Sequence, residues 1–359
     1  MHIETPTLLL NETIARRNIE RMAQKALQNN VRFRPHFKTH QSAAVGAWFR
    51  DYDVTAITCS SINMARYFAN NGWDDITIAF PVNWRQIETI NDLAGRVSLN
   101  LLVESVETVN FLRDNLSASV NLWLKIDVGL HRTGIAWDDA SHLTHVAGAI
   151  KEAGLSLRGL LTHSGHSYKA PDMQKVYDET VTRLERARDS LRDLFPNLEL
   201  SLGDTPSCSL VDDLSVVDEI RPGNFALYDM MQAKIGSCST DNIAVGMACP
   251  VVAKHPERGT IIVHGGAVHL ASDFIDVDGA RYYGAVAHLT SDGWSEPLPD
   301  CFVQSISQEH GVLRVSDAVM NQVQVGGVLV VLPVHSCHTV AANTAYHTLS
   351  GETLPIARF

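Results

Sequence analysis

Short β-like runs alternate with helical patterns from the N-terminus to about residue 227 of this 359-residue chain, and this alternation limits the possible folds most strongly. Each run is followed by a helix or by a connection long enough for one, and their number is that of a (β/α)8 barrel. A doubly wound sheet is the main rival, but no GxGxxG fingerprint follows any of the early runs. The expected strands are residues 31–38, 54–60, 75–81, 96–103, 121–128, 155–163, 198–203 and 216–221.

Two amphipathic patterns between these runs predict helices. The longer one covers residues 172–195, where apolar residues recur every three to five positions with charge on the opposite face. The other begins at Ser105, a suitable N-cap, and places Val106, Val109 and Leu112 on one side. Both patterns are typical of the helices that connect parallel strands.

Beyond about residue 236 the sequence changes character. Gly, Val, Thr and His become frequent, and β-like runs follow one another without helices between them. We therefore expect a barrel over residues 11–235 and an all-β domain over residues 236–359, with residues 1–10 associated with the β-domain. Its expected strands are residues 259–264, 280–289, 301–307, 312–315, 327–333 and 344–349.

Composition narrows the range of partners and compartments. The chain is 45% hydrophobic and 19% charged, as is ordinary for a globular enzyme, and its net charge of −11 with no basic block makes nucleic acid and anionic membranes poor partners. No apolar run approaches the ~20 residues of a membrane span, and the N-terminus lacks a signal-peptide pattern. The six cysteines are scattered without a CxxC pair, which favours the cytoplasm over a disulfide framework.

The motif RPHFKTH places Lys38 at the end of the first expected strand, among Arg34, His36 and His40. Neighbouring positive charges disfavour another one, so this amine is expected to lose its proton more readily than a surface lysine does. A free amine is what Schiff-base chemistry with a carbonyl requires. The motif alone fits a solvated basic loop equally well.

Polar motifs follow five of the expected strands, at the ends where a (β/α)8 barrel carries its active site. A lone histidine at a strand end is more often a core or rim residue, but five such segments on one expected face are difficult to assign to chance. They are RPHFKTH, KIDVGLHRTG with Arg132, THSGHSY with His163, His166 and Tyr168, LGDTPS, and RPGNFALYD.

Two of these segments have the composition of a phosphate site. Gly203, Thr205 and Ser207 offer backbone N–H groups and hydroxyls ahead of a helix that a proline would start. Gly223 and Asn224 allow close backbone approach. A lysine and a phosphate cradle on one face indicate pyridoxal 5'-phosphate. The alternative for residues 203–207 is a simple helix cap.

A second constellation lies in the β-domain, where an apolar run leads into His335, Ser336, Cys337 and His338. In an extended chain His335 and Cys337 would share a face, and His338 would lie on the other. An imidazole nitrogen and a thiolate are preferred zinc ligands, and two protein ligands leave positions for water and substrate. The alternative is a buried thiol beside a surface histidine.

Together, RPHFKTH, KIDVGLHRTG, THSGHSY, RPGNFALYD and the late HSC resemble the D-threonine aldolase and D-serine dehydratase branch of the alanine racemase-like (fold type III) pyridoxal-phosphate enzymes. The similarity covers nearly the whole chain and implies a homodimer with its sites near the interface. It assigns Lys38 to cofactor attachment, Arg132 to the cofactor's phenolic oxygen, Tyr228 and the 203–207 loop to its phosphate, and His335 with Cys337 to a divalent metal. Tyr168, Gly223 and Asn224 are further candidates for cofactor binding.

Within this branch, a cysteine at the second metal position resembles the zinc-dependent dehydratases, whereas the aldolases tend to carry aspartate there. Cys337 therefore favours a dehydratase with Zn²⁺, since a carboxylate would suit Mn²⁺ or Mg²⁺ better. Gln41 departs from the branch, where a basic residue often follows the TH of RPHFKTH. This difference leaves the local charge and the choice of substrate open.

Several functions remain possible for a D-amino acid substrate. A dehydratase acting on D-serine or D-threo-3-hydroxyaspartate would use Lys38 to take the Cα proton and zinc to assist loss of hydroxide, giving a 2-oxo acid and ammonia. An aldolase would use His163 or His166 as a base and release glycine and an aldehyde. An amino-acid racemase has no use for the metal, and a non-enzymatic cofactor-carrying protein would leave these groups idle. The dehydratase is the favoured prediction.

Overall fold

The computed structural model describes residues 2–359, which cluster in two compact units. The barrel unit consists of residues 21–38 and 49–223 with Phe359, and the β unit consists of residues 2–20, 39–48 and 224–358. Within residues 2–359, every helix is too short or too polar to cross a lipid bilayer.

Parallel strands form a ring in the barrel unit, in the order β2-β3-β4-β5-β6-β8-β9-β10 and back to β2. The ring is completed after β2, where His36 forms a parallel bridge with Thr58. The predicted (β/α)8 barrel is therefore confirmed and the doubly wound sheet is excluded. The strands are β2 (Arg32–Phe33), β3 (Ala56–Cys59), β4 (Asp75–Pro81), β5 (Ser98–Val103), β6 (Asn121–Asp127), β8 (Ser156–Thr162), β9 (Glu199–Leu202) and β10 (Glu219–Ile220); a short β7 (Ile135–Ala136) pairs with β6.

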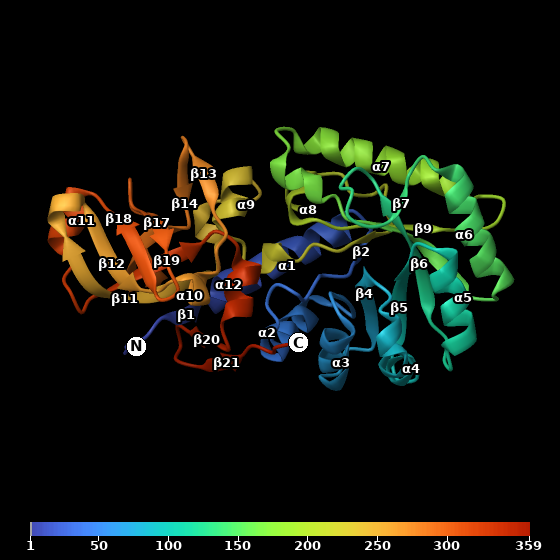
Figure 1. Cartoon of the computed structure of the whole chain (residues 1–359), viewed down its shortest axis with the longest axis horizontal. Helices are drawn as coiled ribbons and strands as arrows, with labels where there is room; N and C mark the ends of the chain where they lie inside the picture. Colours follow the sequence, from blue (N-terminus) through green and yellow to red (C-terminus); the bar gives the residue numbers. More distant parts are fainter. Residues whose placement is uncertain (1) are drawn as a thin grey trace. The chain divides into compact units, whose positions relative to one another are not determined.

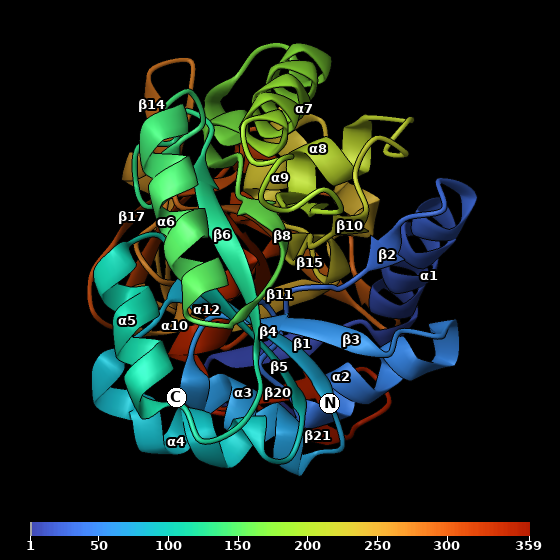
Figure 2. The same cartoon turned by 90° about the vertical axis from the view of Figure 1, so that its right-hand side faces the viewer.

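Helices cover the outside of these strands, as Figure 2 shows for α3 to α7. Strands with a filled barrel on one face and helices on the other are buried on both, which is why they read as continuous apolar runs. Trp123 of β6, for example, is fully buried against Leu102 and Leu161. The helices are α3 (Ile62–Asn70), α4 (Ile87–Ala94), α5 (Val106–Asn115), α6 (Ala140–Glu152), α7 (Met173–Asp189) and α8 (Thr205–Leu210). Helix α1 (Glu12–Gln28) has residues in both units.

The two amphipathic patterns form helices, and their starts are capped by side chains. Ser105 accepts a hydrogen bond from the backbone N–H of Thr108 at the start of α5, at 3.2 Å. Asp172 accepts one from Lys175 at the start of α7, at 3.0 Å. The longer helix ends at Asp189, earlier than the pattern predicted, because the following residues form tight turns of which Leu191 N–H to Arg188 O is one.

Antiparallel strands form a second closed barrel in the β unit, in the order β11-β12-β18-β17-β15-β19 and back to β11 (Figure 1). β1 pairs with β11, and β20 and β21 extend the sheet beyond β1. The strands are β1 (Thr7–Leu10), β11 (Val245–His255), β12 (Thr260–His264), β15 (Gly284–Thr290), β17 (Phe302–Ile306), β18 (His310–Arg314), β19 (Val328–Pro333), β20 (Ala345–Thr348) and β21 (Thr353–Pro355). Short helices of this unit include α2 (Ala43–Trp48), α9 (Met230–Ile235), α10 (Ala267–Leu270), α11 (Asp317–Gln322) and α12 (Ser336–Ala342).

Candidate cofactor and metal sites

Basic side chains gather around His163, which follows β8 in the barrel unit. Burial lowers the pKa of His163 to about 3, and the positive charges of Lys38, Arg132 and Arg221 contribute to this shift. Burial, followed by the charges of Arg221 and Arg132, likewise lowers the pKa of Lys125 in β6 to about 7. The structure therefore brings the predicted Lys38, Arg132 and His163 into one cationic cluster, which fits an anionic ligand.

One ring nitrogen of His163 is fixed by the barrel. Nδ1 lies 2.5 Å from the carbonyl oxygen of Gly203, and because a carbonyl only accepts hydrogen bonds, Nδ1 carries the proton. Nε2 is left with a lone pair in the neutral ring. A Cβ atom at Gly165 would lie 3.1 Å from this Nε2, so the glycine keeps the space beside it open.

Lys125 is a candidate site residue that the sequence analysis did not identify. Its side chain is buried, and Nζ donates a hydrogen bond to the carbonyl oxygen of Ile126 at 3.0 Å. The sequence feature that could have identified it is a lysine inside the apolar run LWLKID, because a buried strand rarely includes an unpaired cation. With a pKa of about 7, this amine is partly deprotonated at neutral pH.

Lys38 lies in a turn after β2, since the strand expected over residues 31–38 stops at Phe33 apart from the bridge at His36. The structure corrects the reason given for its reactivity. The guanidinium of Arg34 is fully buried and pairs with Glu219 at 2.6 Å and Asp75 at 2.7 Å. Burial lowers the pKa of His40 to about 3, which makes this ring neutral. Neither residue is the unbalanced positive charge that the motif suggested.

Residues 203–207 form a helix cap. Asp204 is the N-cap of α8, where its Oδ1 accepts hydrogen bonds from the Ser207 backbone N–H at 2.7 Å and from Ser167 Oγ at 3.1 Å. The Ser207 N–H therefore already has a hydrogen-bond acceptor within the protein. Thr205 remains a candidate for the phosphate site. Gly203 is needed for close packing, because a Cβ atom there would lie 2.9 Å from Cβ of Arg221.

The remaining barrel candidates follow β8 and β10. His166 and Tyr168 lie in the short helix η3 (Gly165–Lys169). Burial, then the charge of Arg183, lowers the pKa of His166, and neither of its ring nitrogens has a hydrogen-bond partner among the described residues. Gly223 ends the barrel unit after β10.

His335 and Cys337 meet in the β unit, but not through an extended chain. β19 ends at Pro333 and α12 begins at Ser336, so the expected alternation of side chains through this segment is wrong. His335 is the N-cap residue of α12. Burial acts to lower its pKa, but the interactions with Asp273 and Cys337 outweigh burial and raise the pKa to about 10. The Cys337 thiol is buried and lies 3.3 Å from Oγ1 of Thr39.

Asp273 joins two imidazoles beside this thiol. Its carboxylate lies 3.5 Å from Nδ1 of His335 and 2.7 Å from Nδ1 of His338, and the two ring centroids are 4.2 Å apart. His338, expected on the opposite face, therefore belongs to the same group because the chain turns into a helix at this point.

Asn224 and Tyr228, two cofactor candidates, lie in the β unit. Asn224 Nδ2 donates to Asp229 Oδ2 at 2.6 Å and lies 3.7 Å from the Cys337 sulfur, so it is part of the surroundings of the thiol. Tyr228 is buried and has a left-handed backbone with φ of 49°, and its N–H donates to the Asn224 carbonyl at 2.7 Å.

A surface cavity of about 420 Å³ lies in another part of the barrel unit. It is lined by residues such as Arg188, Arg192, Asn197 and Glu199. Glu199 begins β9, so this cavity is at the N-terminal ends of the strands. Active sites of (β/α)8 barrels lie at the opposite ends, where the cationic cluster is found.

A closed parallel barrel with basic side chains at its strand ends, together with a closed antiparallel β unit, defines the alanine racemase-like class. The chain belongs to the family described as alanine racemase, N-terminal domain, whose model matches residues 11–230. A second model, described as "Putative serine dehydratase domain", matches residues 244–349.

Full-length relatives are similar to both units. The chain is 28% identical to D-threo-3-hydroxyaspartate dehydratase of Delftia sp. (strain HT23), over 98% of this chain and 95% of that protein. It is 26% identical to D-serine dehydratase of Dictyostelium discoideum, over 100% and 96% of the two chains. A 3-hydroxy-D-aspartate aldolase of Paracoccus denitrificans is 23% identical over 89% of this chain and 82% of its own.

The solved structure of the Delftia dehydratase matches with a TM-score of 0.91 and 27% identity, covering 99% of this chain and 98% of that one. Structures of its variants match similarly, one with a cysteine-to-alanine change in the metal-free form and one with a histidine-to-alanine change. In that protein the two substituted residues are two positions apart.

Proposed function

We propose that this chain is a pyridoxal-phosphate- and metal-dependent lyase that dehydrates a D-3-hydroxy amino acid, of the D-serine or D-threo-3-hydroxyaspartate type, to a 2-oxo acid and ammonia. The placement of His335 and Cys337 together at the start of α12, where each influences the other, is the observation that carries this proposal. The histidine and cysteine substituted in the Delftia dehydratase have the same spacing, and its cysteine variant is the metal-free one. Similarity to two dehydratases over nearly the whole chain supports the same class of reaction.

The cationic cluster of the barrel unit fits pyridoxal phosphate. An amine at Lys38, the cations of Arg132 and Arg221 and the partly protonated amine of Lys125 suit a ligand with an aldehyde, a phenolic oxygen and a phosphate. When bound, this cofactor supplies an electron sink that stabilises negative charge at Cα. We propose that Lys38 holds it covalently and Arg132 contacts its phenolic oxygen. Further proposed contacts are Tyr168, Gly203, Thr205, Ser207, Gly223, Asn224 and Tyr228.

The group around Cys337 fits zinc. A thiol and an imidazole at the start of one helix are a soft ligand pair, which suits Zn²⁺ better than Mn²⁺ or Mg²⁺. Asp273, whose Oδ1 lies 3.5 Å from Nδ1 of His335, is placed to orient this ring. An ion held by His335 and Cys337 would supply Lewis acidity for the departure of the substrate's 3-hydroxyl group.

The pKa of His163 argues against this residue as the base of an aldol cleavage. Dehydration needs a base at Cα, and we propose the Lys38 amine for this role. Aldol cleavage needs a base for the 3-hydroxyl group, for which His163 and His166 were the candidates. A ring whose pKa is held at about 3 is a weak base, so His163 is better suited to accept a hydrogen bond at Nε2 and orient the substrate.

Product analysis tests this proposal directly. The purified protein, loaded with pyridoxal phosphate and Zn²⁺, is assayed with D-serine, D-threonine and D-3-hydroxyaspartate. Ammonia and a 2-oxo acid in equal amounts are expected. Glycine and an aldehyde would instead establish the aldolase alternative, which the similarity to the Paracoccus aldolase keeps open.

Removing the metal separates the lyase from a racemase. A racemase breaks only the Cα–H bond and does not need a Lewis acid at the 3-hydroxyl group. We expect exhaustive chelation to lower lyase activity at least about a hundredfold and added Zn²⁺ to restore it, since a bound metal contributes several kcal/mol to such a step. Cys337→Ala is expected to reproduce the loss without recovery. Full activity after chelation contradicts the metal-dependent mechanism.

We further propose a cytoplasmic homodimer with its active sites near the interface. Among residues 2–359, none of the six cysteines forms a disulfide, which supports a reducing compartment. Light scattering of the active protein tests the assembly, for which twice the 39.5 kDa chain mass is expected. A fully active species of the chain mass would contradict the dimer.

A further inference from the structure

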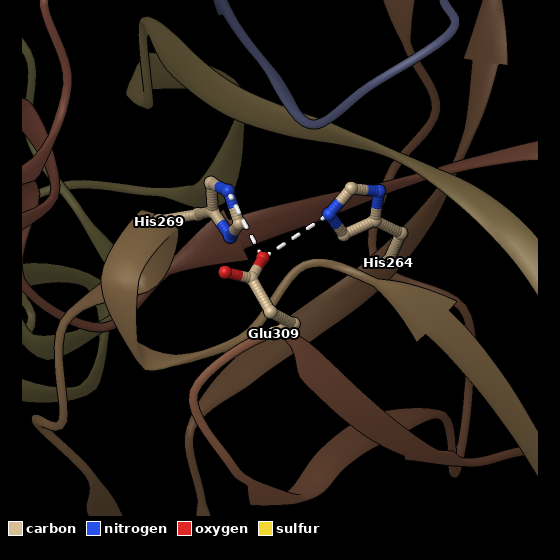
Figure 3. A group of neighbouring side chains, drawn as sticks. All are labelled: His264, His269 and Glu309. Atoms are coloured by element: carbon tan, nitrogen blue, oxygen red, sulfur yellow. Dashed lines mark hydrogen bonds and ion pairs between the residues drawn. The ribbon is translucent and has the colours of Figure 1, made fainter.

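His264, His269 and Glu309 form another cluster of metal-ligating side chains in the β unit (Figure 3). Oε2 of Glu309 lies 3.2 Å from Nε2 of His264 and 3.8 Å from Nε2 of His269. The cluster shares no residue with the His335 and Cys337 group, and the reaction proposed above does not use it.

The separations between these atoms are those of ligands to a single ion. With zinc bonds of about 2.0–2.1 Å in a tetrahedron, two ligand atoms lie about 3.3–3.4 Å apart. The pair at 3.2 Å already meets this spacing, and the pair at 3.8 Å reaches it by a small side-chain rotation. All the ligand atoms lie within 4.8 Å of one another, and in Figure 3 both imidazoles face the same carboxylate.

The main chain holds the ligand-bearing segments together. His264 ends β12, His269 lies in α10, and Glu309 lies in the turn before β18. The N–H of Gly265 donates to the Glu309 carbonyl at 2.9 Å. A Cβ atom at Gly266 would lie 2.3 Å from the Ser307 carbonyl oxygen, so only glycine allows the two segments to lie this close. The ligand positions are thus set by packed backbone, as a preorganised site requires.

Charge and exposure also suit a cation. The Glu309 carboxylate supplies a negative charge, and neutral imidazole nitrogens and a carboxylate oxygen are ligands that zinc accepts. The side chains of His264, His269 and Glu309 are 35%, 20% and 49% exposed, so solvent reaches the cluster and an ion can enter.

We propose that His264, His269 and Glu309 bind a divalent transition-metal ion, best matched by zinc, at a site additional to His335 and Cys337. Three protein ligands leave a fourth position for water. This ion ties α10 to β12 and to the turn before β18.

Helix α10 also contacts α12, the helix that carries Cys337. Oγ1 of Thr339 donates to the Leu270 carbonyl at 2.9 Å, and Nδ2 of Asn343 donates to the His269 carbonyl at 3.0 Å. An ion that fixes α10 therefore supports the helix beside the His335 group. Its role is structural, and the proposal does not depend on the reaction that the enzyme catalyses.

Zinc binding by the full-length, cofactor-loaded protein tests this site. Chelator-treated protein is titrated calorimetrically with Zn²⁺, and bound zinc is measured after gel filtration. Two equivalents per chain are expected for the unaltered protein. His269→Ala and Glu309→Gln are each expected to weaken one equivalent at least about tenfold and to leave the other unchanged. His310→Ala, a change at the exposed neighbouring histidine, is the matched control and should keep both.

A variant that lacks the proposed catalytic metal ligands distinguishes this site from the catalytic one. His335→Ala combined with Cys337→Ala should retain one equivalent, which the addition of Glu309→Gln removes. The site is refuted if the unaltered protein binds a single equivalent that Glu309→Gln leaves unchanged, or if two equivalents persist in both His269→Ala and Glu309→Gln. Glu309→Gln removes only a partly exposed charge, so this variant tests the site even if His269→Ala misfolds. Circular dichroism checks the fold of each variant.

Discussion

The two ends of the parallel barrel differ in the charged side chains that they carry. Near the N-terminal ends of the strands, Arg34 pairs with Glu219 and Asp75, and Arg32 pairs with Glu199 at 2.7 Å. Around His163, at the other end, Lys38, Arg132 and Arg221 all act to lower the pKa of the buried ring, and no carboxylate of residues 2–359 lies among the groups that shift it. Buried charges are tolerated when they are paired, so the first set belongs to the stability of the barrel. A cluster of cations around one neutral buried ring is instead typical of a site that binds an anionic ligand.

The largest expected effect is on enzyme activity, at the barrel end that carries the cationic cluster. Lys38→Ala should lower activity at least about a thousandfold, because both the covalent attachment of the cofactor and the base are removed. Mass spectrometry after borohydride reduction should show no cofactor attached to the chain. Lys125→Met is the matched change at the other amine of the cluster and should retain the attachment. Attachment that survives Lys38→Ala and disappears in Lys125→Met would transfer the role to Lys125.

Substitutions at the barrel end with paired charges should instead change the stability of the protein. Glu219 is fully buried, and Arg34 holds its pKa below the usual value although burial acts to raise it. Glu219→Gln leaves the Arg34 guanidinium with less compensation, and a loss of about 3–5 kcal/mol in the free energy of unfolding is expected. Urea unfolding followed by circular dichroism measures it. Arg192→Gln removes an exposed ion pair with Asp189 and should change stability little. Equal effects of Glu219→Gln and Arg192→Gln would contradict the conclusion that the buried Arg34–Glu219 pair stabilises the barrel.

The smallest effect is a dependence of stability on pH. The folded-state pKa of His163 is about 3, below the 6.5 of the unfolded chain. Between these values the unfolded chain binds the proton and the folded protein does not, so stability is lost as the pH falls below 6.5. Each pH unit in this window should remove up to about 1.4 kcal/mol through this group. His163→Gln should show a shallower slope in urea unfolding from pH 6.5 to 4.5. An unchanged slope would mean that the ring gains a proton in the folded protein.

Most barrel strands were predictable because burial on both faces produces continuous apolar runs. β4 was predicted at its observed bounds, Asp75–Pro81. The longest strand of the β unit, β11, was not predicted, because Gly246 and Pro250 interrupt its apolar run. Tertiary pairing overrides this local signal, since Pro250 lies in register with Val328 of the neighbouring β19.

Local sequence determined which chemistry is available in this protein, whereas the tertiary structure decided which groups act together. The strand alternation, the caps at Ser105 and Asp172, and the amine, imidazole and thiol of the motifs follow from residue type and short spacing. The neutralisation of Arg34 depends on carboxylates far away in sequence, and the lowered pKa of Lys125 depends first on burial in the barrel and then on the charge of the distant Arg221. The meetings of Asp273 with His338 and of Glu309 with His264 likewise join distant segments. Electrostatic and ligand interactions act over a few ångströms in space, and sequence separation does not reveal those distances.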